Sequence, residues 1–276
     1  MPRLLLLLCA LAVAACGDEA ETDPTAVSGG AELTTADAVA DAVLERYDAN
    51  VGAVDGFVVR SAGLEARYVP SDDTTGLDRF GSPDIQPIED APVAPDKAQL
   101  LLNHVPNGRR LARGLRTAEL GGTVTRDGRR AYLLQSSDPG MLIGEPGLSA
   151  ELGLQTRVYV DAETFDVLEI YRGIESDTTG AVTGRIIYSD FREADGLRLP
   201  YRVREVTTGL NGAMDSDTRM VMGGQLSLQK RQLEAAPASP ERDERLAQVN
   251  AQLRMLNEGV LENEVVVESV EVPEAE

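Results

Sequence analysis

The sequence has few of the residues from which most catalytic and metal sites are built. Its 276 residues include one histidine, two cysteines and no tryptophan. A Ser-His-Asp triad would need His104, and no Gly-x-Ser-x-Gly segment supplies the serine, so we expect His104 to be a satisfied surface or helix-end residue. Zinc sites need several His or Cys ligands, and neither a calcium-loop pattern nor a glycine-rich phosphate motif is present. We therefore expect no metal, no cofactor and no enzymatic activity.

Basic residues are also scarce. Lys and Arg total 26 against 46 Asp and Glu, which gives a formal net charge of -20, and only Lys97 and Lys230 are lysines. Nucleic-acid binding requires a basic face that neutralises phosphates, so this charge argues against DNA and RNA as partners. The apolar share of 42% is large enough for a folded core.

The N-terminus has the features of an export signal. Arg3 precedes an uncharged apolar run from Leu4 to Val13, which is about half the ~20 residues that a transmembrane helix needs. Val13-Ala14-Ala15-Cys16 resembles the lipobox of bacterial lipoproteins. The resemblance implies that residues 1–15 are removed and that Cys16 carries the lipid, and two or three acyl chains anchor a protein stably. The alternative is an ordinary signal peptide with a coincidental cysteine.

The same resemblance implies a location in the cell envelope, with the protein on the periplasmic face of a membrane. Asp directly after the lipidated Cys favours retention at the inner membrane, and this chain has Gly17 there, so the outer membrane is favoured. Cys9 leaves with the signal peptide, and no thiol remains for a disulfide. Residues 16–33 are acidic and without periodicity, which predicts a flexible tether before one domain at residues 34–276.

The first half of this domain reads as a helix, two strands and a long loop. The Thr34-Thr35-Ala36-Asp37 start signal and apolar residues at four-residue steps predict a helix from Thr35 to Asn50. Residues 57–60 and 64–69 are predicted strands, residues 72–95 a loop, and residues 96–104 a short helix. The cluster of Arg109, Arg110, Arg113 and Arg116 is interpreted as a pairing surface for surplus carboxylates, with an anion or lipid-headgroup site as the alternative.

From residue 115 the hydrophobic pattern has period two and indicates three hairpins. Asp127-Gly128 and Asp195-Gly196 are strong turn signals, and residues 161–164 form the third turn. In the last of these strands Leu197, Leu199, Tyr201 and Val203 share one face and arginines the other, as in a sheet with one dry side.

Residues 214–257 interrupt the sheet with the spacing of a helical hairpin, in which Ser239 caps the second helix ahead of Pro240. Its methionines are interpreted as core filler, with an adaptable binding surface as the alternative. Residues 263–272 alternate again and predict a single closing strand.

Three runs carry a resemblance to a known family. They are Asp127 to Leu134 (DGRRAYLL), Val158 to Thr164 (VYVDAET) and Tyr188 to Pro200 (YSDFREADGLRLP). Together with the lipobox and the element order, they resemble the LolA/LolB-like superfamily of outer-membrane lipoprotein-sorting proteins over residues 34–272. The resemblance implies an α+β fold, an open antiparallel half-barrel with helices covering its concave face, which holds acyl chains. The helical hairpin at 214–257 departs from the family pattern.

An open sheet that side chains do not fill leaves an apolar mouth, which is a typical ligand site. The predicted lining is Val158, Val160, Leu168, Ile170, Ile187, Leu199 and Tyr201, and the alternative is that these residues pack as a dry core. The leading hypothesis is a lipid-anchored, non-catalytic protein that binds or transfers a lipid or the acyl chains of a lipoprotein. A second is a structural or sensory adaptor whose hairpin docks an envelope protein, and a third is an enzyme working through carboxylates.

Overall fold

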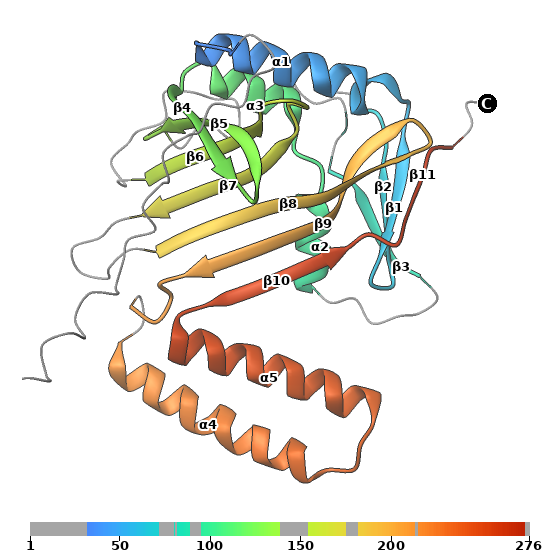
Figure 1. Ribbon diagram of the computed structural model, residues 1–276. Helices are drawn as coiled ribbons and strands as arrows, with labels where there is room; N and C mark the ends of the chain where they lie inside the picture. Colours follow the sequence, from blue (N-terminus) through green and yellow to red (C-terminus); the bar gives the residue numbers. More distant parts are fainter. Residues whose placement is uncertain are drawn as a thin grey trace, which may run out of the picture. The chain divides into compact units, whose positions relative to one another are not determined.

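The computed structural model describes residues 32–71, 80, 82–88, 95–138, 154–174, 182–212 and 215–273 (Figure 1). These residues belong to one structural unit, residues 32–276. The predicted signal peptide, Cys16 and almost all of the tether lie outside the described residues.

Seven antiparallel strands form the larger sheet, in the order β10-β9-β8-β7-β6-β5-β4. Because β4 and β10 do not pair with each other, the sheet is open, and the mixed α+β class predicted from the sequence is confirmed. The strands are β4 (Glu119–Arg126), β5 (Arg129–Ser136), β6 (Leu154–Asp161), β7 (Val167–Ile174), β8 (Val182–Ala194), β9 (Leu197–Thr208) and β10 (Leu261–Val266).

The three predicted hairpins are present, and local turn chemistry explains two of them directly. Asp127 and Gly128 have φ of 48° and 77°, and Asp195 and Gly196 have 50° and 80°. Two successive positive φ angles define the type I′ turn, whose twist matches the strands that it joins. The turns therefore set the register of β8–β9 and of the part of β4–β5 next to the turn, and the β4–β5 register shifts between Leu120 and Thr123.

A second sheet has four strands in the order β11-β1-β2-β3, namely β11 (Ser269–Glu271), β1 (Phe57–Ser61), β2 (Leu64–Tyr68) and β3 (Asp84–Pro87). Strand β3 corrects the prediction of a loop over residues 72–95, because Ala66 pairs with Ile85 despite the Pro and Asp content of that segment. The predicted closing strand is also wrong as a single strand. It divides at Val267 and Glu268, so that β10 ends one sheet and β11 enters the other.

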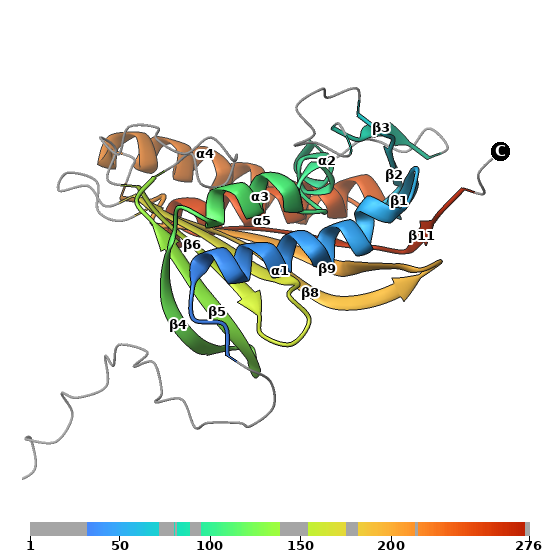
Figure 2. The ribbon, with the colours of Figure 1, turned by 90° about the horizontal axis from the view of Figure 1, so that it is seen from above.

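Helices α1 (Ala36–Ala49), α2 (Pro95–Leu102) and α3 (Gly108–Leu115) contribute to the same hydrophobic core as the sheets. The Thr35 side chain accepts a hydrogen bond from the amide of Ala38 and so begins α1 as its cap. A 3₁₀ turn, η1 (Val51–Ala53), follows α1. Figures 1 and 2 show α1 and α3 side by side over the larger sheet.

The predicted helical hairpin is present as α4 (Ser216–Ala235) and α5 (Pro240–Glu258), and Ser239 accepts from the amide of Arg242 as predicted. Helix α5 packs on β10, and α4 packs on α5 (Figure 1). The interpretation of the α4 methionines as core filler is wrong, because Met220 is 73% exposed and α4 has no buried residue.

Candidate functional site

The candidate site is a cavity of about 60 Å³ between the α1 and α3 helices and the larger sheet. Most of its lining is apolar, and a small group of polar side chains stands among these residues. That combination is typical of ligand sites, where apolar walls give affinity and a few polar groups fix orientation. The lining residues are Val43, Arg46, Tyr47, Asn50, Val51, Val105, Pro106, Gly108, Phe165, Asp166, Val167, Tyr188, Phe191, Arg198, Leu199 and Pro200.

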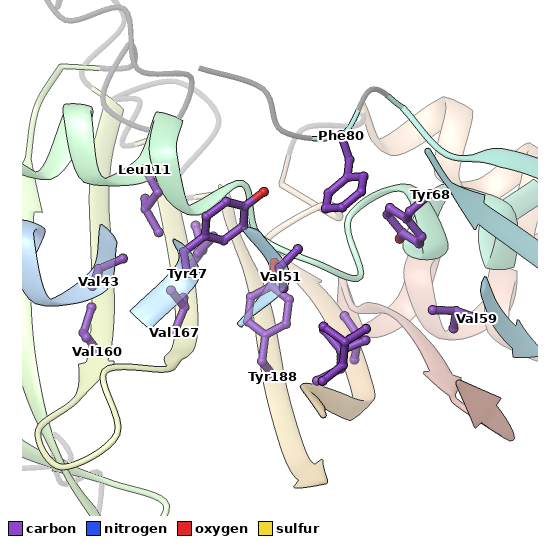
Figure 3. Close-up of a cluster of buried hydrophobic side chains, with 14 of the residues drawn as sticks. Val43, Tyr47, Val51, Val59, Tyr68, Phe80, Leu111, Val160, Val167 and Tyr188 are labelled. Atoms are coloured by element: carbon purple, nitrogen blue, oxygen red, sulfur yellow. The ribbon is translucent and has the colours of Figure 1, made fainter. Parts of the chain in front are cut away.

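The helical side of the cavity follows from the spacing of apolar residues in α1. Val39, Val43 and Tyr47 recur every four residues, so they lie on one face of the helix, and all three are buried. Figure 3 shows Val43 and Tyr47 in one cluster with Val160 and Val167 of the sheet. The apolar face of α1 thus packs on the apolar face of the larger sheet and covers it.

An ion pair joins this helix to the sheet at the cavity. Asp166, which directly precedes β7, accepts from Arg46 Nε at 3.2 Å and from Arg198 Nε at 3.0 Å. Its carboxylate is 6% exposed, whereas the two arginine side chains are 29% and 24% exposed. Thr164 Oγ1 also donates to Asp166 at 2.8 Å. One carboxylate therefore holds two guanidinium groups, and the cluster carries a net positive charge.

Asn50 makes a second connection between the end of α1 and strand β9. Its side-chain amide donates to the carbonyl of Arg198 at 2.7 Å and accepts from the Arg198 amide at 2.7 Å. Asn50 is the C-cap of α1, so the helix ends where its cap binds the sheet. The two connections meet at Arg198, which contributes its backbone to one and its side chain to the other.

The turn between β6 and β7 is held in place around Asp166. Asp161 Oδ1 accepts from the amides of Glu163 and Thr164 at 2.9 and 2.7 Å, and Arg129 pairs with Asp161 Oδ2 at 2.6 Å. Phe165 has a φ of 58°, which is unusual for a large side chain. The fixed turn positions Asp166 for its contacts with α1 and β9.

The size of the cavity decides what the observed arrangement can hold. Sites for small molecules have volumes of roughly 300–1,000 Å³, while a water molecule occupies about 30 Å³ in the liquid. The cavity of about 60 Å³ has room for a few waters or a short apolar group. An acyl chain fits only if the α1 and α3 layer moves away from the sheet.

Five of the seven predicted lining residues lie on the helix-covered face of the sheet. Val158, Val160, Ile170, Leu199 and Tyr201 belong to the main core cluster, with exposures of at most 8%. Leu199 alone among the seven lines the cavity. The others pack as core.

The structure does not bring Leu168 and Ile187 together with those five. Leu168 packs on the opposite face with Ala131, Leu133 and Tyr159. A β-bulge pairs Val160 with Val167 next to the Tyr159–Glu169 pair, so Leu168 is the extra residue and alternation breaks there. Ile187 pairs directly with Glu169 and therefore shares the opposite face with it, while Ile186 turns toward the helices.

The opposite face holds a charged cluster that the sequence did not reveal. Glu169, whose side chain is 1% exposed, accepts two hydrogen bonds from Arg126 at 2.8 and 2.9 Å and two from Arg185 at 2.7 and 2.9 Å. Hydrogen bonding to Glu169 raises the pKa of Arg185. The Arg126 guanidinium also lies 4.8 Å from the centre of the Tyr159 ring. Since both guanidinium groups are engaged by Glu169, this cluster stabilises the sheet and leaves little capacity for an anion.

His104 lies two residues beyond the end of α2 and is fully buried, so the expectation of a satisfied surface or helix-end residue is wrong. Its Nε2 lies 2.6 Å from the carbonyl of Pro200, and its Nδ1 has no partner within the described part of the chain. Burial lowers the pKa of His104 to about 4, so the imidazole is neutral at pH 7. Tyr188 nearby donates to the carbonyl of Asn103 at 3.2 Å, and burial raises the pKa of its phenol.

The arginine cluster of α3 pairs with acidic residues of α1, in agreement with the interpretation as a pairing surface. Arg109 Nε lies 2.9 Å from Asp48 Oδ1, and Arg116 bonds to Asp41. Arg113 is exposed. These pairs join the two covering helices along their polar sides.

Sequence reasoning did not identify Arg46, Asn50, Asp166 and Arg198 as a group. The local sequence around each residue suggests no role beyond secondary structure. Arg46 is a polar residue of a helix, Asn50 ends that helix, Asp166 follows a turn, and Arg198 alternates with the apolar residues of a strand. The two pairs span 120 and 148 residues of sequence. A weak signal was available, because Asp166 is the second residue after the predicted turn at residues 161–164.

Comparison of the chain with protein-family models, curated proteins and solved structures finds no match. Within the described ranges, no helix is both long and apolar enough to cross a membrane, and no cluster of acidic, His or Cys residues could hold a metal ion.

Proposed function

We propose that this chain is a lipid-anchored protein of the cell envelope that binds or transfers a hydrophobic acyl chain between its covering helices and its open sheet, without catalysis. The observation that carries the proposal is the cavity between α1 and the sheet, which is lined mainly by apolar side chains and bordered by Arg46, Asp166 and Arg198. The LolA/LolB-like half-barrel is part of the same proposal. The open seven-stranded sheet with helices over one face supports it.

The observed arrangement is the closed state in this proposal. Opening exposes the apolar faces of α1 and of the sheet, and an acyl chain replaces the contacts that the two faces make with each other. Each buried methylene of such a chain contributes about 0.8 kcal/mol, so a long chain can offset the loss of the α1 contacts. The ligand therefore occupies the place where α1 residues such as Val43 and Tyr47 now lie.

The polar connections of α1 then set how easily the site opens. The Arg46–Asp166 pair and the two Asn50–Arg198 hydrogen bonds must break or shift when the end of α1 leaves the sheet. A ligand with an anionic head group can replace Asp166 as the partner of either guanidinium, because carboxylates and phosphates bind arginine in the same way. Arg46→Ala is expected to ease opening and to weaken retention of an anionic ligand.

Lipid extraction tests the ligand. The mature chain is produced with Cys16→Ala and without residues 1–15, purified, extracted with organic solvent and analysed by mass spectrometry, and a fluorescent fatty acid is titrated in parallel. We expect co-purified lipid and saturable binding. Absence of both would exclude an acyl-chain ligand.

A matched pair of variants localises the binding. Ile170→Ala and Leu168→Ala remove similar side chains from β7 on either side of Glu169, and the two residues are 8% and 5% exposed on opposite faces of the sheet. Binding beneath the helices predicts that Ile170→Ala changes the affinity for the fatty acid and that Leu168→Ala does not. Equal effects would place the ligand elsewhere.

Metabolic labelling tests the anchor. Labelled palmitate is expected in the full-length chain and not in the Cys16→Ala variant. Equal labelling of the two proteins would contradict lipidation at Cys16.

A further inference from the structure

Helix α4 packs on α5, and the outer face of α4 is exposed. Gly223, Leu226 and Leu233 are partly buried on the side toward α5. On the opposite side Met220, Val221 and Leu228 are 73%, 60% and 53% exposed. The spacing of three and four residues places them with Gly224 in one stripe along the helix. Large apolar side chains exposed in a continuous stripe mark an interaction surface.

The middle of this stripe carries no charge. No charged residue occurs from Met220 to Gln229, although the chain as a whole has a net charge of -20. The nearest charges on the stripe are Asp217 and Arg231, and they are equally far in sequence from Gly224. Within the described residues neither side chain forms an ion pair.

We propose that this stripe is the interface with a second copy of the chain, with two α4 helices packed antiparallel about a two-fold axis at Gly224. In that arrangement Met220 packs against Leu228 of the partner subunit, and Asp217 pairs with Arg231 of the partner subunit. Two-fold symmetry repeats each of these contacts, as it must in a self-complementary interface. Gly224 lies on the axis, where the absence of a side chain lets the two backbones approach.

The arrangement of charge favours a second copy over a lipid surface. An anionic membrane attracts basic residues at every edge of a docking helix and repels carboxylates, whereas the stripe has an acid at one end and a base at the other. An antiparallel copy satisfies both ends at once. Because the stripe lies on the side of α4 opposite α5, the two hairpins meet through their α4 helices, and each α5 stays on the outer side.

One pair of helices makes a small interface, so the dimer is weak and depends on concentration. If both copies are held on one membrane by the lipid anchor proposed above, their effective concentration rises and a weak interface suffices. The contacts at α4 do not depend on the lipid site beneath α1, so the two proposals can fail separately.

Disulfide formation at the axis tests the arrangement. In the mature chain with Cys16→Ala no thiol remains, and Gly224→Cys introduces one at the two-fold axis. A β-carbon at Gly224 meets nothing within 4 Å, and neither does one at Gly223, so both substitutions fit the protomer. Mild oxidation is expected to join Gly224→Cys copies rapidly. Gly223→Cys, which faces α5, is the matched control, and equal rates for the two variants would overturn the proposal.

Sedimentation equilibrium of the mature Cys16→Ala chain tests the ion pairs. We expect a monomer–dimer equilibrium that Asp217→Arg or Arg231→Asp weakens about tenfold, because each variant replaces two attractive pairs by two repulsive ones. The double variant restores both pairs with reversed sign and is expected to restore the dimer. Helix content by circular dichroism checks that all variants fold. A protein that stays monomeric up to high concentration, or a double variant that remains monomeric, would overturn the proposal.

Discussion

Helices α1 and α4 both carry apolar side chains at helical spacing, but they differ in how much of that apolar surface is buried. In α1 the apolar residues form one stripe, and Val39, Ala40, Val43 and Tyr47 are buried. In α4, which is longer, apolar residues lie on both sides of the helix, and none is buried. One neighbour, α5, can cover only one side.

The spacing of apolar residues predicted both helices correctly, but it did not predict which surface each helix packs against. A single stripe fits one packed surface, as in α1. Two stripes require two surfaces, and the described part of this chain supplies α4 with one. The second stripe is therefore the place where a further surface is expected. The four predictions that follow test whether the sheet and its covering layer differ in energy from α4 as they do in burial.

The largest contrast is expected between two leucines. Leu115 of α3 is fully buried in the layer over the sheet, whereas Leu228 of α4 is 53% exposed. Leu115→Ala should lower the free energy of unfolding by about 2–5 kcal/mol because it leaves a cavity. Leu228→Ala should change it by no more than about 0.5 kcal/mol in dilute solution. Urea unfolding measures both, and equal losses would remove the distinction between the two layers.

A similar contrast is expected for ion pairs. Glu169 is buried between Arg126 and Arg185, and Glu169→Gln should cost about 3 kcal/mol because two guanidinium groups lose their charged partner. Glu234 pairs with Lys230 at 3.8 Å on the surface of α4, and Glu234→Gln should cost at most about 0.5 kcal/mol. Thermal and urea unfolding at low and high salt measure the loss of stability in the two variants. A small effect at Glu169 would mean that the sheet accommodates the unpaired arginines.

Acid should weaken the buried layer through His104. The pKa of His104 is about 4 in the folded state against 6.5 in the unfolded state, so the unfolded chain binds the proton more strongly between these values. The contribution of His104 is complete above pH 6.5 and is lost as the pH falls toward 4, where the loss reaches about 3 kcal/mol. His104→Gln, which can still donate to Pro200, should flatten this part of the profile of unfolding free energy against pH. If the unfolding free energy of His104→Gln falls with pH as steeply as that of the unchanged protein, other groups cause the fall.

The smallest individual effects, of opposite sign, are expected at two glycines in helices. A β-carbon at Gly108 would meet ring and β-carbon atoms of Tyr47 at 2.4 to 2.5 Å, so Gly108→Ala should destabilise the protein by about 1–3 kcal/mol. Gly224 has open space around it, and Gly224→Ala should stabilise the monomer by about 0.5–1 kcal/mol through helix propensity. Chemical unfolding at low protein concentration measures both. Changes of the same sign would show that α3 can shift away from α1.

Local chemistry made much of the fold predictable. Thr35 caps α1, Ser239 caps α5, and the Asp127-Gly128 and Asp195-Gly196 turns fix two strand pairs. Each of these signals acts over a few residues, so it can be read without knowing the rest of the molecule. The alternation of Leu197, Leu199, Tyr201 and Val203 was likewise sufficient to place them in the core.

Features that depend on distant parts of the chain were not predictable in the same way. One extra residue in β7 moved Leu168 to the other face of the sheet, and no turn signal marks that bulge. Strand β3 exists because β2 offers it an edge. The Arg46–Asp166–Arg198 group joins a helix, a turn and a strand that are far apart in sequence, and only Leu199 of the predicted lining lies at that cavity.

The α4–α5 hairpin begins and ends at neighbouring strand ends, which allows it to be removed or replaced. Thr207 pairs with Leu261, and the amide of Leu210 donates to the carbonyl of Gly259 at 3.1 Å, so the chain leaves β9 and enters β10 at nearly the same point. A short turn can bridge two such neighbouring strand ends. The hairpin is therefore a module that can be removed, or exchanged for another, at a single junction without changing the order of the sheet.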